Sequence, residues 1–295
     1  MMTHEAWKQA RAGRFTSSII GKLMSAPRSI SDADIEKYRH LVTDMEPWTE
    51  TKSGVNKGQL RKTTGYNDRL KKAMEDNGVV LFGDTALSVI RKKAHERLSG
   101  RPEPEFYTFA TQRGNDLEEV ARELVSTHWQ KIYVTGAERN QFVPWGDWGG
   151  CTIDGLADEG EATLDIKCPQ DTGKIIGYAT SVSDGDNEAL KAWDSDYYWQ
   201  IQDQMRVMGL KRGYLVYFDD RWALYKHDVS KYLDLDFVQF APDDQGFAYI
   251  VRSFPADPEA HRLIELTINA AAILCGEMVE ALTNEAILNQ QRRNA

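Results

Sequence analysis

GGCTIDGLADEGEATLDIKCP, residues 149–169, is the segment from which the architecture of this chain can best be inferred. Cys151–Leu156 and Ala162–Ile166 are both rich in apolar and β-branched residues, which is typical of β-strands. The polar cluster Asp158–Glu161 lies between them and contains a glycine, which indicates a turn. The segment therefore predicts a β-hairpin.

The register of this hairpin determines which side chains face one another. If the loop is centred between Glu159 and Gly160, opposed residues have numbers that sum to 319, and Asp154 faces Asp165. Directly opposed side chains have Cβ atoms about 4.5–5.5 Å apart. Lys167 is two residues from Asp165 and points to the same face. The hairpin therefore predicts a convergence of two carboxylates and an amine, provided that the loop does not shift the register by one residue.

Two facing carboxylates destabilise a sheet unless a cation lies between them. Oxygen ligands suit a hard ion such as Mg²⁺, which binds one or two carboxylates together with substrate phosphate. The lysine beside the ion can orient or deprotonate a water, or stabilise charge on a phosphorus centre. Two alternatives remain open at this point. One is an exposed hairpin with solvated charges, and the other is a Ca²⁺-stabilised structural domain, which the lysine disfavours.

The composition indicates a protein with a full hydrophobic core. The chain has 295 residues, of which 41% are hydrophobic, enough for one large domain or one domain with embellishments. It has no run of about 18 apolar residues and no apolar signal region, so neither a membrane span nor a secretory signal is expected. Its three cysteines predict reduced thiols and a cytoplasmic setting, and they exclude a four-cysteine iron–sulfur cluster. The scattered histidines exclude structural zinc.

The net charge is −9, which argues against capture of nucleic acid by overall charge alone. A local basic surface or bound metal ions can still provide the attraction. Two segments, Lys57–Lys72 and Arg91–Arg97, are rich in basic residues. Each is interpreted either as a nucleic-acid surface or as the solvated face of a helix.

The remaining hydrophobic patterns predict mostly helices. Expected helices are two short ones within Trp7–Met24 around a turn at Gly13, then Asp32–Asp44, Gly58–Asp76, Thr85–Leu98, Ala110–Gln130, Asp194–Met208 and Asp257 to about Asn289. Expected strands are Lys131–Val143 and a second hairpin of Lys211–Asp219 with Trp222–Val229, whereas Gln170–Trp193 is expected to be irregular. The last helix is expected to cover one side of the sheet.

Two of these helices carry residues of interest. In Ala110–Gln130 an apolar stripe at helical spacing has Glu118 at its edge; the stripe consists of Leu117, Val120, Ala121, Leu124 and Val125. In Asp194–Met208 two faces are distinguished. Tyr198, Gln202 and Arg206 form the face expected to meet nucleic acid, and Tyr197, Ile201, Met205 and Met208 form the face expected in the core.

These motifs, taken in order, resemble the lambda exonuclease family of phage and viral recombination nucleases, also described as alkaline exonucleases or YqaJ-type proteins. The resemblance covers roughly residues 7–230 and rests on Trp7–Ser18, Arg113–Glu118, Asp154–Leu156, Asp165–Pro169 and Tyr198–Gln202. Several ordered motifs are more specific than any one alone. The family belongs to the restriction-endonuclease-like superfamily, so the resemblance implies an α/β fold with a central mixed β-sheet flanked by helices.

The resemblance also implies roles for individual residues. Glu118, Asp154, Asp165 and the carbonyl of Ile166 would bind two Mg²⁺ ions, for which Mn²⁺ could substitute, and Lys167 would position the hydrolytic water. Gln202, with Gln200 as a further candidate, would support the site from its helix. Arg11, Ser18 and Gln202 would receive the 5′-phosphate of the substrate, since a guanidinium and a hydroxyl suit a dianion. One departure is Asp165, where lambda exonuclease has a glutamate.

The function implied is a Mg²⁺-dependent 5′→3′ exonuclease. It would degrade one strand of linear double-stranded DNA to mononucleotides and leave a 3′ single strand for recombination. Family members form ring-shaped homotrimers on DNA ends and work beside a single-strand annealing protein, so a phage or prophage protein in the bacterial cytoplasm, with no membrane contact, is expected. Two alternatives are an endonuclease of the same superfamily and a non-catalytic DNA-binding protein that retains the fold.

The whole chain is expected to be a single nuclease domain. Its N-terminal helical part would span about residues 1–105, its catalytic core about 106–230 and its C-terminal helical part about 231–295. Arg11 and Ser18 would then act from outside the catalytic core.

Overall fold

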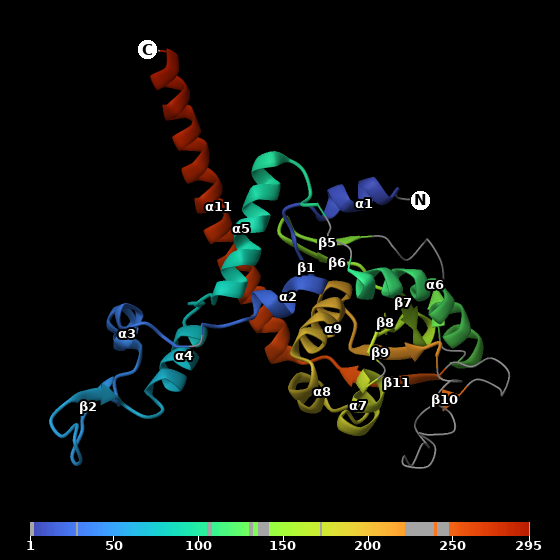
Figure 1. The fold of residues 1–295 in the computed structure, drawn as a ribbon, viewed down its shortest axis with the longest axis horizontal. Coiled ribbons are helices and arrows are strands. Elements are labelled where there is room, and N and C mark those ends of the chain that lie inside the picture. The colour runs from blue at the N-terminus through green and yellow to red at the C-terminus, as the bar shows by residue number, and fades with distance from the viewer. Residues whose placement is uncertain are drawn as a thin grey trace.

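The computed structural model describes residues 3–27, 29–104, 108–129, 132–134, 142–171, 173–221, 239–240 and 248–294 (Figure 1). The helices are α1 His4–Arg11, α2 Ser17–Leu23, α3 Asp32–Tyr38, η1 Arg39–Leu41, α4 Tyr66–Asp76, α5 Asp84–Ser99, α6 Phe109–Trp129, η2 Asp158–Gly160, α7 Gly173–Ser181, α8 Asn187–Trp193, α9 Ser195–Met208 and α11 Pro258–Asn294. The strands are β1 Phe15–Thr16, β2 Trp48–Glu50, β3 Leu60–Lys62, β4 Ile132–Val134, β5 Val143–Trp145, β6 Gly149–Cys151, β7 Gly155–Ala157, β8 Ala162–Lys167, β9 Arg212–Asp219, β10 Gln239–Phe240 and β11 Ala248–Pro255.

The main sheet has six described strands in the order β10-β11-β9-β8-β7-β4. β8 and β9 are parallel and every other pair is antiparallel, so the sheet is mixed, as predicted. β9 alternates between two hydrophobic layers: Leu215 and Tyr217 face one layer, and Val216 and Phe218 face the other. Because this strand is buried on both sides, its sequence is a continuous apolar run rather than an alternating one.

Helices cover both faces of this sheet (Figure 1). α7, α8 and α9 pack on the face that contains Tyr217, and α6 packs on the opposite face through Ala121 and Val125. Leu117 and Leu124 of the predicted stripe also pack there, but Val120 is 44% exposed, so that part of the prediction is wrong.

The N-terminal segment attaches to this core through a second, three-stranded sheet of order β1-β6-β5. β1 pairs with β6 in parallel, directly before the hairpin. α2 packs closely on α9, where a Cβ on Gly21 would lie 2.3 Å from a carboxylate oxygen of Asp196. β2 and β3 form a third sheet, and together with α3 and α4 they constitute an arm, residues 30–77, with its own hydrophobic core.

The C-terminal helix α11 packs differently from the prediction. Ile264, Ile268 and Cys275 lie in a cluster with α2 and α5 instead of covering the sheet. Figure 1 shows its last turns extending beyond the body of the molecule. Pro258–Ile287 is long and apolar enough to cross a membrane by length and composition alone, a test that core helices of soluble proteins also pass. The sequence predicted this helix but no membrane span, because polar residues interrupt its apolar positions.

Several predicted elements need correction. Gln170–Trp193 contains α7 and α8. An irregular segment was predicted there because the stretch is rich in glycine and aspartate. The segment after Gly58 first forms β3, and α4 begins only at Tyr66. The predicted strand Cys151–Leu156 is divided between β6 and β7, which belong to different sheets. The predicted partner strand Trp222–Val229 lies outside the described residues.

Candidate active site

The hairpin has the predicted register. Gly155 pairs with Leu164, and Ala157 pairs with Ala162 across the four-residue loop, so paired residue numbers sum to 319. The ladder ends at Gly155, and the backbone N–H of Asp154 donates instead to the carbonyl of Leu164 at 3.1 Å. Asp154 therefore lies just beyond the end of β7, at the edge where β8 continues alone.

Asp154 turns its side chain toward β8. Its Oδ2 accepts the backbone N–H of Ile166 at 2.7 Å. In a strand, the N–H and C=O of one residue point to the same side, so the Ile166 carbonyl also faces this edge. Carboxylate and carbonyl oxygens are thereby presented together, the donor set that hard divalent cations prefer.

Asp165 is held from three directions. Lys167 Nζ lies 2.6 Å from Asp165 Oδ2, while the amide nitrogens of Gln200 and Gln204 donate to Oδ1 at 2.8 and 2.9 Å. Lys167 also donates to the Gln200 side-chain oxygen at 3.3 Å and lies over the ring of Tyr197. The carboxylate is 3% exposed, so these donors fix its orientation.

Glu118, on α6, is linked to the same edge of the sheet by Arg122, which contacts both Glu118 and Asp154. The Arg122 guanidinium is 1% exposed and forms ion pairs with Glu118 and Glu119. Its Nε donates to the main-chain carbonyl of Asp154 at 2.9 Å. Arg122 therefore ties helix α6 to the start of β7, and sequence analysis missed it because an arginine on a helix has no signal of its own.

The charges at this edge are incompletely balanced. Burial raises the pKa of Asp154 well above its usual value, and Asp165 and Glu118 raise it further, whereas Lys167 and the Ile166 N–H lower it. Burial alone would lower the pKa of Lys167, but Asp165 and Asp154 outweigh it and hold this pKa above its ordinary value. Lys167 is therefore a cation here, suited to orienting groups and stabilising negative charge rather than to removing a proton.

Within the described part of the chain, no group of three or more His, Cys, Asp or Glu side chains converges as a ready metal site. Asp154 and Asp165 still fit a divalent cation, because burial and the neighbouring Asp165 raise the pKa of Asp154, and a bound cation would favour the ionised carboxylate. Glu118 is engaged by Arg122 and does not complete a three-acid cluster.

Gln202 does not reach this site, which corrects the sequence prediction. It is fully buried on the other side of α9, where its Nε2 donates to Asn187 and the Pro255 carbonyl and its Oε1 accepts the Asp257 N–H. Residues two apart on a helix point in nearly opposite directions, whereas residues four apart share a face. Gln200 and Gln204 are such a pair, and this spacing could have identified them.

The face of α9 that was expected to meet nucleic acid is therefore internal. Tyr198 and Gln202 are fully buried, and the side chain of Arg206 is 7% exposed. Arg206 pairs with Asp203 at 2.7 Å and stacks on Trp145. The core face was predicted correctly for Ile201 and Met205, which are buried.

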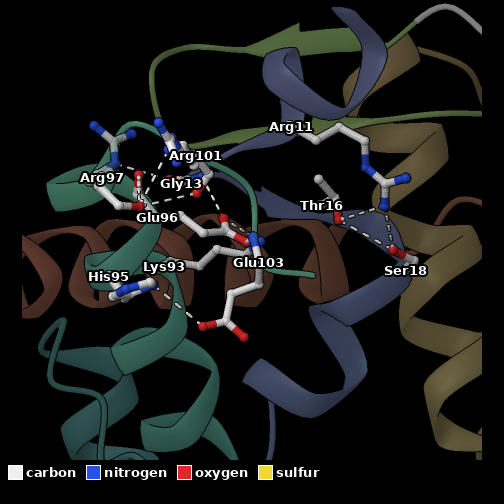
Figure 2. A network of polar contacts seen from close by, with 11 residues as sticks. Arg11, Gly13, Thr16, Ser18, Lys93, His95, Glu96, Arg97, Arg101 and Glu103 are labelled. Carbon is white, nitrogen blue, oxygen red and sulfur yellow. Dashed lines mark hydrogen bonds and ion pairs between the residues drawn. The ribbon is translucent and has the colours of Figure 1, made fainter. Parts of the chain in front are cut away.

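The structure brings Arg11 and Ser18 together (Figure 2). Arg11 Nη2 donates to Ser18 Oγ at 3.1 Å and lies 3.4 Å from Thr16 Oγ1, while the guanidinium stacks on Trp7. Trp7 Nε1 in turn donates to Thr152 Oγ1 at 3.1 Å, two residues before Asp154. The guanidinium and hydroxyls thus form a polar group attached to the base of the hairpin.

The turn between Arg11 and Ser18 is fixed by α5. Gly13 has a φ of +68°, and its N–H donates to Glu96 at 2.6 Å while its carbonyl accepts from Arg97 at 2.9 Å (Figure 2). A Cβ on Gly13 would lie 2.5 Å from the Arg97 side chain. Glycine is therefore required both by the positive φ and by the close approach of α5.

Comparisons with known proteins agree with this architecture. Residues 78–211 match the YqaJ-like viral recombinase domain. An alkaline exonuclease, LHK-Exo, from Laribacter hongkongensis superposes with a TM-score of 0.58 at 19% identity, covering 96% of this chain and 98% of that one. A phage-related exonuclease from Haemophilus somnus 129PT gives 0.52 at 19% identity, with 91% and 96% covered. No curated protein matches the sequence.

The chain thus has the restriction-endonuclease-like α/β fold of these alkaline exonucleases, as expected from its motifs. Within it, residues 78–211 match the model of the YqaJ-like viral recombinase domain, in agreement with the resemblance noted from the sequence. The domain includes Glu118, Asp154, Asp165 and Lys167, whereas Arg11 and Ser18 precede it.

Proposed function

We propose that this protein is a Mg²⁺-dependent 5′→3′ exonuclease that degrades one strand of linear double-stranded DNA to mononucleotides and leaves a 3′ single strand for recombination. The observation that carries the proposal is the meeting of Asp154, Asp165 and Lys167 at one edge of the sheet. The shared fold of exonucleases from Laribacter and Haemophilus supports the same reaction class.

Asp154, Asp165 and the Ile166 carbonyl are the groups that would hold divalent cations, two by the resemblance, with Mn²⁺ able to replace Mg²⁺. Glu118 is proposed as a further ligand, although Arg122 holds it in this structure. The bound cation would polarise the scissile phosphodiester and stabilise the attacking and leaving oxygens.

The other residues act by orientation. Lys167, as a cation, would position the attacking water and stabilise negative charge on the phosphoryl oxygens. Gln200 and Gln204 hold Asp165 in place through its Oδ1. Arg11 and Ser18 would bind a terminal 5′-phosphate, because a guanidinium and a hydroxyl offer several donors to a dianion. The resemblance further suggests a ring-shaped homotrimer on DNA ends and a single-strand annealing partner.

The decisive experiment compares 5′-phosphorylated linear duplex with closed circular duplex, in Mg²⁺ and in EDTA. The proposal predicts digestion of the linear duplex alone, only with Mg²⁺, and release of mononucleotides from a 5′ label before a 3′ label. Digestion of the circle would instead indicate an endonuclease, and binding without cleavage would indicate a non-catalytic protein. Light scattering tests the trimer, which requires three chains of 33.5 kDa.

End recognition is tested by Ser18→Ala on duplexes with 5′-phosphate or 5′-hydroxyl ends. The variant should lose about fivefold of the preference for the phosphate, the effect of about one hydrogen bond. Lys22→Ala, an exposed change on the same helix α2, is the matched control. An unchanged preference in Ser18→Ala would remove this residue from the phosphate site.

A further inference from the structure

The β2–β3 hairpin of the arm, residues 48–62, is basic in a chain whose net charge is −9. Its basic residues are Lys52, Lys57, Arg61 and Lys62, and its one acid is Glu50. No aspartate or glutamate occurs between Glu50 and Asp68. The family domain begins at residue 78, so the hairpin lies outside it and no role in the proposed hydrolysis accounts for it.

The base of the hairpin is anchored to the arm. Lys62 Nζ forms an ion pair with Asp32 at 2.9 Å and donates to the Ile30 carbonyl, also at 2.9 Å. Trp48, opposite Lys62 in the ladder, packs against the core of the arm. An isolated two-stranded hairpin is only marginally stable in water, so these contacts hold it in place.

Beyond this base the hairpin extends into solvent. Residues 52–61 are all exposed, and Figure 1 shows the hairpin at the end of the molecule remote from the six-stranded sheet. Backbone hydrogen bonds define the tip, including Lys57 N–H to the Gly54 carbonyl at 3.2 Å and Gly58 N–H to the Thr51 carbonyl at 2.9 Å. The basic side chains therefore extend from a hairpin whose turn has a defined backbone structure.

The two faces of the hairpin differ in charge. Alternation along the strands places Glu50 on the face of Trp48 and Lys62, which turns toward the arm. Arg61 pairs across the ladder with Thr49 on the opposite face, which contains no acid. In the described part of the chain, Lys52, Lys57 and Arg61 form no ion pair, whereas Lys71 and Lys72 on nearby α4 pair with Glu75 and Asp76.

We propose that the β2–β3 hairpin binds the phosphate backbone of duplex DNA through Lys52, Lys57 and Arg61. This proposal rests on the proposed function, since it takes DNA as the ligand. Three unpaired cations on a projecting hairpin that contains one acid match a polyanion with regularly spaced charges. Val55 at the tip and Leu60 are 102% and 73% exposed, so apolar contact with the sugars is available beside these cations.

The test is the salt dependence of binding by the full chain to a 5′-phosphorylated linear duplex. Fluorescence anisotropy is measured in EDTA, which blocks hydrolysis, across KCl from about 50 to about 200 mM. Each lost phosphate contact reduces the slope of log K against log salt by about 0.9. Lys52→Ala/Lys57→Ala should therefore lower the slope by about 1.8, and adding Arg61→Ala should lower it by about 2.7.

Lys71→Ala/Lys72→Ala is the matched control, because it removes the same charge from paired lysines of the same arm. It should leave the slope unchanged. An equal slope for wild type and both hairpin variants, in a wild type that binds and cleaves DNA, overturns this inference and leaves the proposed function standing. Failure of the wild type to bind DNA overturns both. A changed mass in light scattering with an unchanged slope also overturns it, by assigning the hairpin to contact between copies.

Discussion

Buried aspartates occur in two different electrostatic environments in this molecule. At the interface of α2 and α9, Asp203 accepts from Arg206 at 2.7 and 3.0 Å and from Ser17 at 2.6 Å, and its charge is matched by a buried cation. At the edge of β8, Asp154 and Asp165 share one lysine. The first cluster is a completed ion pair, and the second retains excess negative charge.

The pKa shifts of Asp203 and Asp154 have different causes, which reflects the same difference in charge balance. Burial raises the pKa of Asp203, but Arg206 and Ser17 act in the opposite direction. Burial also raises the pKa of Asp154, and there the neighbouring Asp165 and Glu118 add to the increase. Unbalanced buried charge is typical of functional sites, so the comparison favours the proposed active site at the β8 edge and a structural role for the ion pair at the α2–α9 interface.

The largest expected effect separates the two clusters by activity. Asp154→Asn should reduce cleavage of 5′-phosphorylated linear duplex in Mg²⁺ by about 10³-fold, because the amide keeps the shape but loses the charge that a cation requires. Its Oδ1 can still accept the Ile166 N–H, so the fold should persist. Initial rates measure the effect, and circular dichroism confirms folding. Activity near that of the wild type would remove Asp154 from the site.

Asp203→Asn should show the reverse behaviour. Removing one partner of a buried ion pair leaves an uncompensated charge on Arg206, which costs about 3–5 kcal/mol. Urea unfolding should therefore reveal a large loss of stability, while the activity of the remaining folded protein should be close to that of the wild type. If the variant unfolds at the wild-type urea concentration, the structural role of this pair is wrong.

The glutamines of α9 give a smaller contrast. Gln204→Ala should lower activity about tenfold with little change in stability, because its amide orients Asp165. Gln202→Ala should lower the free energy of unfolding by about 1–3 kcal/mol, because it leaves buried partners unsatisfied. Rates and urea melts on both variants separate the roles. The opposite pattern would restore Gln202 to the site.

The smallest expected effect is a pH dependence. In EDTA, Asp154 should be protonated in the folded protein at pH values where it is ionised in the unfolded chain, whose reference pKa is 3.8. Its contribution to stability is then fully present below that value and is lost as pH rises through the raised folded pKa. In Asp154→Asn, the free energy of unfolding should therefore fall less as the pH rises through this range. Parallel curves of unfolding free energy against pH for the two proteins would contradict it.

The sequence was sufficient to predict the hairpin, because its register depends on a local loop and a strict two-residue period. It was also sufficient for Asp154, Asp165 and Lys167 to be brought together and for α5, α6 and α9 to be placed within one or two residues. The family motifs added Arg11 and Ser18, which the structure places in contact.

Other features depend on long-range packing that local patterns do not contain. Gln202 and Gln204 are both polar residues on one helix, and only the neighbours of α9 determine which of them is buried against Asp257. Arg122 becomes significant only when α6 lies beside β7. The β2–β3 hairpin was not predicted: β3 fell within the helix expected after Gly58 and no strand was expected at β2, because strands of three residues are too short for a clear period.

The most direct test of the excess charge at the β8 edge is the effect of Mg²⁺ on thermal stability. Wild type, Asp154→Asn and Asp203→Asn are melted in EDTA and in increasing Mg²⁺, without DNA. Mg²⁺ should raise the melting temperature of the wild type and of Asp203→Asn, and should have little effect on Asp154→Asn, because only the folded β8 edge binds the ion. Equal increases in wild type and Asp154→Asn, or none in the wild type, would contradict a cation site at Asp154 and Asp165.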